Sequence, residues 1–304
     1  MMGAAYQLER AEGMAETQAP QIRRLVAPNP SPMTYTGTNT YFLGLRDIAV
    51  IDPGPDNDAH FAAIVSAIAP DQKITKILVT HAHLDHAPLA RRLSAHYGAP
   101  IYAYGDSGAG RSAQMIALSA AGKIGGGEGV DYDFQPDITL KDGAVLDHEG
   151  QELIAIWTPG HFGNHMAFSW NGALFSGDHV MAWASTMISP PDGDLGAFRR
   201  SCAQLQQRRE RLYLPGHGDA IEDGPARLHW LLAHRQERES QIISHLQGQP
   251  NSAQGLAEAI YTDIDPRLIH AATRNVLAHL IDLCERNLAT CQGPIDLQAK
   301  YSVI

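Results

Sequence analysis

Short apolar runs separated by polar turns fill the first two thirds of the chain. Segments with the character of strands lie at 22–26, 41–43, 48–52, 74–80, 100–104 and 212–215, with further strand signals from 137 to 178. Helical patterns appear at 58–69, 88–97 and 195–209, and Asp56 or Asn57 can cap the first of them. The pattern therefore predicts a strand-rich region with a few helices.

The pattern becomes helical near residue 222. Helices are predicted at 224–247, 253–261 and 266–288, where Ser252 can cap the second and Pro266 suits the first turn of the third. The last dozen residues alternate weakly and predict a small hairpin or an edge strand. We therefore divide the chain into a flexible N-terminal tail (1–20), a strand-rich domain (21–222) and a helical domain (223–304).

Residues 105–136 give no clear pattern. They include the glycine-rich sequence GKIGGGEG at 122–129, whose spacing does not specify a phosphate-binding loop. We predict a flexible surface connection there.

Composition excludes several classes of protein. The chain of 304 residues is 44% hydrophobic, too apolar for a disordered protein, yet no apolar run approaches the roughly 18 residues of a membrane helix. Three cysteines form no disulfide framework, and residues 1–20 lack the apolar segment of a signal peptide, so we predict a cytoplasmic protein without membrane contact. The net charge of −10 argues against broad binding to nucleic acid, and 15 histidines indicate metal or proton chemistry where they cluster.

Four potential metal ligands stand within six residues, directly after an apolar strand. The segment reads His81-Ala82-His83-Leu84-Asp85-His86. Imidazole and carboxylate groups suit zinc and other borderline divalent ions. A loop at a strand end can aim His81 and His83 at one ion, while Asp85 and His86 point towards a second. The alternative, that these histidines merely line a polar loop, leaves three adjacent imidazoles without a role.

Three further segments repeat the order of strand, glycine-containing turn and ligand-type side chain. They are TPGH (158–161), SGDH (176–179) and LPGH (214–217). Glycine lets the backbone turn sharply at a strand end and approach an ion. Because strand ends at one edge of a sheet converge, the four segments together predict a metal centre at that edge.

These motifs resemble those of the metallo-β-lactamase superfamily. The match comprises HxHxDH at 81–86 followed by His161, Asp178 and His217 in the expected order, and it covers roughly residues 20–222. The resemblance implies an α/β fold, an αββα sandwich with two metal ions at one edge. By position, one ion would be held by His81, His83 and His161, the other by Asp85, His86 and His217, with Asp178 bridging them.

The resemblance also implies a dinuclear metal-dependent hydrolase. Two divalent ions, zinc first with manganese or iron as alternatives, would lower the pKa of the water between them, so that a bridging hydroxide attacks an acyl carbon or a phosphorus. Asp85 is the residue that we expect both to bind an ion and to orient this hydroxide. The two ions would also make the cleft locally positive, able to receive an anionic substrate.

A narrower resemblance extends over nearly the whole chain. Residues 27–44, 234–242 and 271–280 are similar to the lactamase-beta-2-like group, which implies a small C-terminal, winged-helix-like helical domain. Some members of that group are single-strand-specific endoribonucleases. Two substrate classes therefore remain: a small acyl substrate, such as a thioester, a lactone or a β-lactam, and a phosphodiester in single-stranded RNA or DNA.

The charge of the helical domain argues against RNA. Residues 223–304 hold seven Lys/Arg against nine Asp/Glu, a net charge of −2, whereas a winged helix that binds nucleic acid usually has a basic face. A nucleic-acid-binding protein with a structural metal site is a third interpretation, and the complete ligand set argues against it. A homodimer is compatible with the architecture.

Other side chains are candidates for places near the metals. His165, four residues after His161, is expected to support a loop or a ligand rather than bind an ion. His179 and Asn39 are candidates for substrate or supporting contacts, although a turn-forming role suits Asn39 equally well. Trp183 and the loop at 189–195 either form a cleft wall or are simply a rigid segment.

Overall fold

Two β-sheets form the larger part of the molecule. The computed structural model describes residues 9–10 and 21–304, so most of the predicted N-terminal tail lies outside the described residues. The first sheet has seven strands in sequence order: β1 (Glu9–Arg10), β2 (Ile22–Val26), β3 (Asn39–Leu43), β4 (Asp47–Ile51), β5 (Lys73–Leu78), β6 (Ile101–Ala103) and β7 (Ile138–Thr139). The second has five, in the spatial order β12 (Leu212–Pro215), β11 (Ala173–Gly177), β10 (Met166–Trp170), β9 (Gln151–Trp157) and β8 (Val145–His148).

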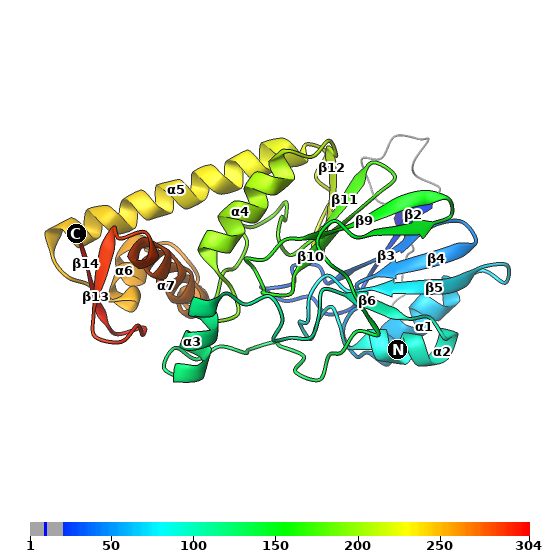
Figure 1. The fold of residues 1–304 in the computed structure, drawn as a ribbon, viewed down its shortest axis with the longest axis horizontal. Coiled ribbons are helices and arrows are strands. Elements are labelled where there is room, and N and C mark those ends of the chain that lie inside the picture. Colours follow the sequence, from blue (N-terminus) through cyan, green and yellow to red (C-terminus); the bar gives the residue numbers. More distant parts are fainter. Residues whose placement is uncertain (1–8, 11–20) are drawn as a thin grey trace.

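Helices cover the outer face of each sheet, which gives the expected αββα sandwich (Figure 1). The helices α1 (Asp58–Ser66) and α2 (Leu89–Tyr97) share a hydrophobic core with the seven-stranded sheet. On the other side, α4 (Leu195–Gln206) and the first part of α5 (Gly224–Gly248) pack on the five-stranded sheet. No helix within residues 21–304 combines the length and apolarity needed to cross a membrane.

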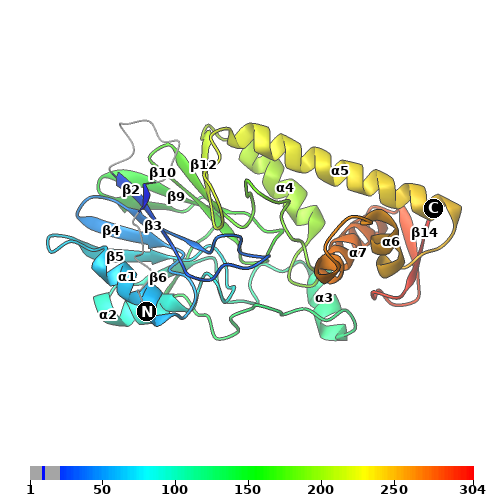
Figure 2. The ribbon, with the colours of Figure 1, turned by 180° about the vertical axis from the view of Figure 1, so that it is seen from behind.

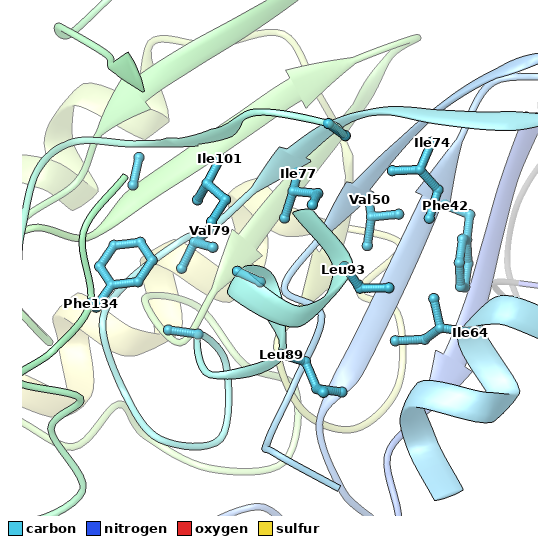
Figure 3. Packing of buried hydrophobic residues seen from close by; sticks show 14 of the residues in the cluster. Phe42, Val50, Ile64, Ile74, Ile77, Val79, Leu89, Leu93, Ile101 and Phe134 are labelled. Carbon is cyan, nitrogen blue, oxygen red and sulfur yellow. The ribbon is translucent and has the colours of Figure 1, made fainter. Parts of the chain in front are cut away.

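Side chains that alternate along the strands divide between two cores, because successive residues of a strand point to opposite faces. Ile48 and Val50 of β4 pack towards α1 and α2. Figure 3 shows Val50 in this cluster together with Phe42. Ala49 and Ile51, which alternate with them, face the second sheet. The continuous apolar sequence of this strand thus reflects burial on both faces of the sheet.

A second body follows the sandwich in the sequence. Figure 2 shows α5 running from the sandwich to this body, which contains α6 (Ala253–Ile260), η2 (Pro266–Leu268), α7 (Ile269–Glu285), β13 (Ala289–Gln292) and β14 (Lys300–Val303). The predicted helices are confirmed, with bounds that differ by a few residues. The last dozen residues contribute one strand, β14, which pairs with β13 just before them, so the alternative of an edge strand describes them. Ser252 caps α6 by accepting a hydrogen bond from the Gly255 N–H.

Residues 105–136, where the sequence gives no clear pattern, contain a helix just before the glycine-rich stretch. A helix, α3 (Ala113–Ala121), lies there, capped by Ser112 and ended by Gly122 in a left-handed conformation. Met115 and Leu118 of α3 share a hydrophobic core with α7. The helix buries only these two side chains, so it lacks a strong pattern of its own and depends on a contact distant in sequence. It also packs across the predicted domain boundary at residue 222.

One buried histidine predicts an unusual dependence of stability on pH. His279 of α7 is fully buried, and neither ring nitrogen has a hydrogen-bond partner among the described residues. Burial, reinforced by the charge of Arg235, lowers its pKa well below the ordinary value. The unfolded chain takes up a proton here below about pH 6.5 while the native state does not, so native stability is lost as the pH falls through that value.

We therefore expect His279→Leu to raise the free energy of unfolding by about 1 kcal/mol at pH near 8, and by more at pH near 5.5. Urea unfolding at the two pH values measures this. His245→Leu, an exposed change on α5, should stay within about 0.5 kcal/mol of the wild type. A His279→Leu variant that is less stable at both pH values would contradict the argument.

Candidate metal centre

Loops that follow four strands carry all seven predicted ligands to one edge of the sandwich. The segment 81–86 follows β5, His161 follows β9, Asp178 follows β11 and His217 follows β12. Strands β11 and β12 are parallel, and the Gly216 N–H donates to the Gly177 carbonyl at 2.9 Å, so the last two ligands leave the sheet together. A Cβ at Gly216 would lie 2.5 Å from Asp178 Oδ1, which explains why this turn needs glycine.

Three imidazoles form the first candidate site. Nε2 of His81 lies 2.9 Å from Nδ1 of His83, and Nε2 of His161 lies 3.3 Å from the same atom. All three candidate ligand atoms lie within 4.8 Å of one another. This spacing suits three nitrogens around one ion.

A carboxylate and two imidazoles form the second candidate site. Nε2 of His86 lies 3.2 Å from Nε2 of His217, which in turn lies 3.2 Å from Oδ2 of Asp85. Asp178 stands between the sites: its Oδ2 is 3.3 Å from His217 Nε2 and 3.8 Å from His161 Nε2. Its Oδ1 is buried without a hydrogen-bond partner among the described residues. This oxygen lies 3.5 Å from His86 Nε2, and a buried carboxylate oxygen without a hydrogen bond, together with facing imidazoles, fits a pair of cations.

The protonation of the histidines differs between the two sites. Burial lowers the pKa of His81 well below its usual range and that of His83 to about 3, so both are neutral donors of a lone pair. Burial alone would also lower the pKa of His217, but the Asp178 carboxylate raises it to about 9. The pKa of His86 is likewise raised, by Asp85 first, against the effect of burial. Positive charge is thus favoured at the second site even without a metal ion.

Partners behind the imidazoles fix their orientation. In four of the histidines, Nδ1 contacts a partner while Nε2 points towards the other ligands. Nδ1 of His81 lies 2.9 Å from Thr80 Oγ1, and Nδ1 of His86 lies 2.9 Å from Asp52 Oδ2. Nδ1 of His161 lies 2.8 Å from the Met187 carbonyl, and Nδ1 of His217 lies 3.1 Å from the Gly37 carbonyl. Such partners set which nitrogen carries the proton and which one faces an ion. Asp52 is the functional candidate that the sequence analysis missed. Its only signal is an aspartate at the end of the strand 48–52, just before the break at Pro53.

The three supporting candidates lie outside the ligand cluster. His165 is buried and accepts a hydrogen bond from the Asp178 N–H at 3.2 Å, so it lies behind the carboxylate between the two sites. Asn39 donates to the carbonyls of Pro215 and Gly218 and so holds the loop that carries His217. His179 is fully buried with its Nε2 3.6 Å from Cys202 Sγ, and it does not line the cleft at the cluster.

A cleft of about 500 Å³ opens onto the cluster. Four of the candidate ligands line it: His83, Asp85, His161 and Asp178. Its other walls come from the loop 27–38, the glycine-rich segment, the loop 181–192 and α7. Two other hollows, of about 490 and 450 Å³, lie around the stacked rings of Tyr104 and Trp157 and contain none of the candidate ligands.

The C-terminal helices hold the loop that orients His161. Arg235 of α5 donates to the Thr186 carbonyl, and Asn275 of α7 accepts from the Ile188 N–H at 3.1 Å. Arg274 of α7 donates to Ser189 Oγ, to the Pro190 carbonyl and to the Ile124 carbonyl. The predicted wall at 189–195 is therefore part of the cleft, through Ser189 and Asp192, and it is tied to the second body.

Two family models match the chain. The model described as "Metallo-beta-lactamase superfamily" matches residues 33–217, and "Beta-lactamase associated winged helix domain" matches residues 252–293. The first contains every candidate ligand, and the second contains α6 and α7.

Individual proteins resemble the chain along most of its length. A "Beta-lactamase-like protein 2 homolog" of Drosophila melanogaster is 27% identical, over 86% of this chain and 87% of that protein. An "Atrochrysone carboxyl ACP thioesterase" of Aspergillus chevalieri is 31% identical, over 78% and 70%. Among solved structures, a metallo-beta-lactamase family protein of Thermus thermophilus is 26% identical with a TM-score of 0.75, covering 94% of this chain and 99% of that one.

Proposed function

The chain belongs to the metallo-beta-lactamase superfamily, and on that premise we propose that this hydrolase is dinuclear and acts on an ester or thioester. The observation that supports it most directly is the position of Asp178. Its buried carboxylate faces one three-ligand group through His161 and the other through His217. A single structural ion would need only one of these groups.

The residues of the cluster have different roles in hydrolysis. Divalent ions held there would supply Lewis acidity, which polarises a carbonyl and lowers the pKa of water towards neutrality. Asp85 lines the cleft, and its side chain is 28% exposed, so its carboxylate can accept a hydrogen bond from the attacking water and orient it. Asp178 and its neighbouring imidazoles already hold their positions before the reaction. Few groups therefore need to move as negative charge develops on the carbonyl oxygen.

An ester is favoured over RNA because the cleft offers no free cation from the described protein side chains. Among those residues, Arg274 is the only Arg or Lys that lines the cleft, and three protein acceptors engage its guanidinium. Proteins that bind a phosphate backbone use several available Lys and Arg. The thioesterase relative agrees with an acyl substrate.

A substrate panel together with metal analysis tests the proposal. We expect close to two metal equivalents per chain after reconstitution with zinc or manganese, and turnover of S-lactoylglutathione or a simple ester or lactone. Faster cleavage of labelled single-stranded RNA than of any ester would overturn the substrate class. Less than about one equivalent with no turnover would favour a binding protein with a structural metal site.

The native metal, the domain boundary and the location in the cell are further proposals. We propose zinc as the native metal, a domain boundary at residue 222 and a cytoplasmic location. The three cysteines, all free thiols, are compatible with that location. A homodimer stays a prediction from the architecture alone.

A further inference from the structure

Apolar side chains dominate the walls of the cleft away from the metal centre. Met33, Leu84, Met181 and Met187 line it from three separate segments, and Ala271 adds a fifth apolar contact from α7. Methionine is unbranched and flexible, so it can cover chains of differing shape. A cavity of about 500 Å³ has the size of a small-molecule site.

Two of these apolar groups remain exposed to water. Met33 is 51% exposed and Leu84 50%. Tyr35 and Trp183 stack with ring centroids 5.1 Å apart and are also exposed, but neither lines this cleft, so Trp183 does not form the cleft wall that the sequence suggested. A single exposed apolar side chain is ordinary, but a group of them around one cavity marks a surface that a ligand covers.

The charged groups of the cleft are already paired, apart from the metal cluster and two side chains at its rim. Asp192 accepts from Arg111 at 2.6 Å and from the Gly127 N–H at 2.7 Å. Arg274 is held by three acceptors of the chain. The remaining two, Glu128 and His270, lie at the exposed rim. The interior therefore offers no partner to a charged chain, while its apolar walls favour an uncharged one.

We propose that this cleft binds an uncharged, apolar chain attached to the scissile ester or thioester, with α7 of the C-terminal body as one wall. The winged-helix body thus shapes a small-molecule site, because Ala271 and Arg274 lie on the face of α7 that lines the cleft. The inference rests on the proposed function and adds the chemical class of the substrate's remaining part.

Two ester series test the proposal on the metal-loaded full chain. One lengthens the acyl group from acetate to octanoate with a constant alcohol, and the other lengthens the alcohol of an acetate. We expect kcat/KM to rise about fourfold per added methylene in one series, since each buried methylene is worth about 0.8 kcal/mol. The series that shows the rise identifies the half of the ester that enters the cleft. An ester of equal length that ends in a carboxylate should react at least about tenfold more slowly.

Variants locate the effect in the cleft. Met33→Gln and Leu84→Gln keep the approximate size of the side chain but make it polar, so each should flatten the dependence on chain length, chiefly through KM. Ile116→Gln is the matched control, because Ile116 is 56% exposed on α3 and does not line the cleft. A flat series in the wild type, or equal slopes in all four proteins, would overturn the proposal.

A binding measurement separates this inference from the proposed function. Calorimetry gives the dissociation constants of n-alkyl carboxylates from acetate to octanoate, independently of turnover. If no ester is hydrolysed, the proposed function fails. Affinity that rises with chain length, and less in Met33→Gln than in Ile116→Gln, would still support the apolar site. Affinity that is constant along the series would overturn it.

Discussion

Replacing Asp85 by alanine is expected to lower kcat/KM for an ester by about a thousandfold, which corresponds to about 4 kcal/mol of transition-state stabilisation. Asp85 contributes one of the three candidate ligand atoms of the second site, and its Oδ2 is 3.2 Å from His217 Nε2. It also reaches the cleft, where it can orient the attacking water. Both roles disappear together in Asp85→Ala.

The fold should survive this change. The Asp85 side chain is partly exposed. His217 contacts both Asp85 and Asp178, so the histidine keeps a carboxylate partner when Asp85 is replaced. Far-ultraviolet circular dichroism and the thermal midpoint should stay close to the wild type, while metal content falls towards one equivalent. Asp133→Ala, which removes an exposed carboxylate, serves as the control for lost negative charge. Turnover by Asp85→Ala within a few-fold of the wild type would remove Asp85 from the mechanism.

The ligand set could be predicted because each ligand stands next to a strong local signal. A continuous apolar strand is expected to lie in the interior of a sheet. A glycine turn at its end leaves the following side chain at the sheet edge. The four loops therefore meet whenever their strands share that edge. His161, Asp178 and His217 come together in the structure from strands that are far apart in the sequence.

The groups that support the ligands had no such signal. Asp52 contacts His86 across 34 positions of sequence, and the partner of His161 is the backbone carbonyl of Met187, which any residue type at that position would provide. The cleft walls depend on how the C-terminal body docks. Arg274, for example, contacts Ile124 across 150 positions. Contacts of this range follow from tertiary packing and leave no periodic trace along the chain.

Exchange of Asp52 for asparagine is expected to remove one metal ion while leaving the protein folded. Asp52 is buried, and its carboxylate accepts from the Thr80 N–H at 2.7 Å, from Thr80 Oγ1 at 2.8 Å and from His86 Nδ1 at 2.9 Å. Its backbone has φ of 50°, a left-handed conformation that asparagine tolerates better than most residues. Asparagine therefore keeps the shape and the backbone and changes only the hydrogen-bond pattern.

The amide can accept from the Thr80 N–H with its oxygen, which turns its NH₂ group towards His86 Nδ1. Two donors cannot face each other, so the proton of His86 moves to Nε2, the nitrogen that points into the second site. The lone pair needed for an ion is then lost.

We expect the affinity for the second ion to fall about 10- to 100-fold, and kcat/KM to fall with it at limiting metal. Metal titration followed by the visible spectrum of the cobalt-substituted protein measures this, and excess metal should partly restore activity. Asp47→Asn, a partly exposed exchange on the strand that Asp52 follows, should bind both ions normally, because a surface ion pair such as that of Asp47 with Lys73 contributes little. Two ions bound by Asp52→Asn with wild-type affinity would show that His86 does not depend on Asp52 for its protonation, and would leave Asp52 with a purely structural role.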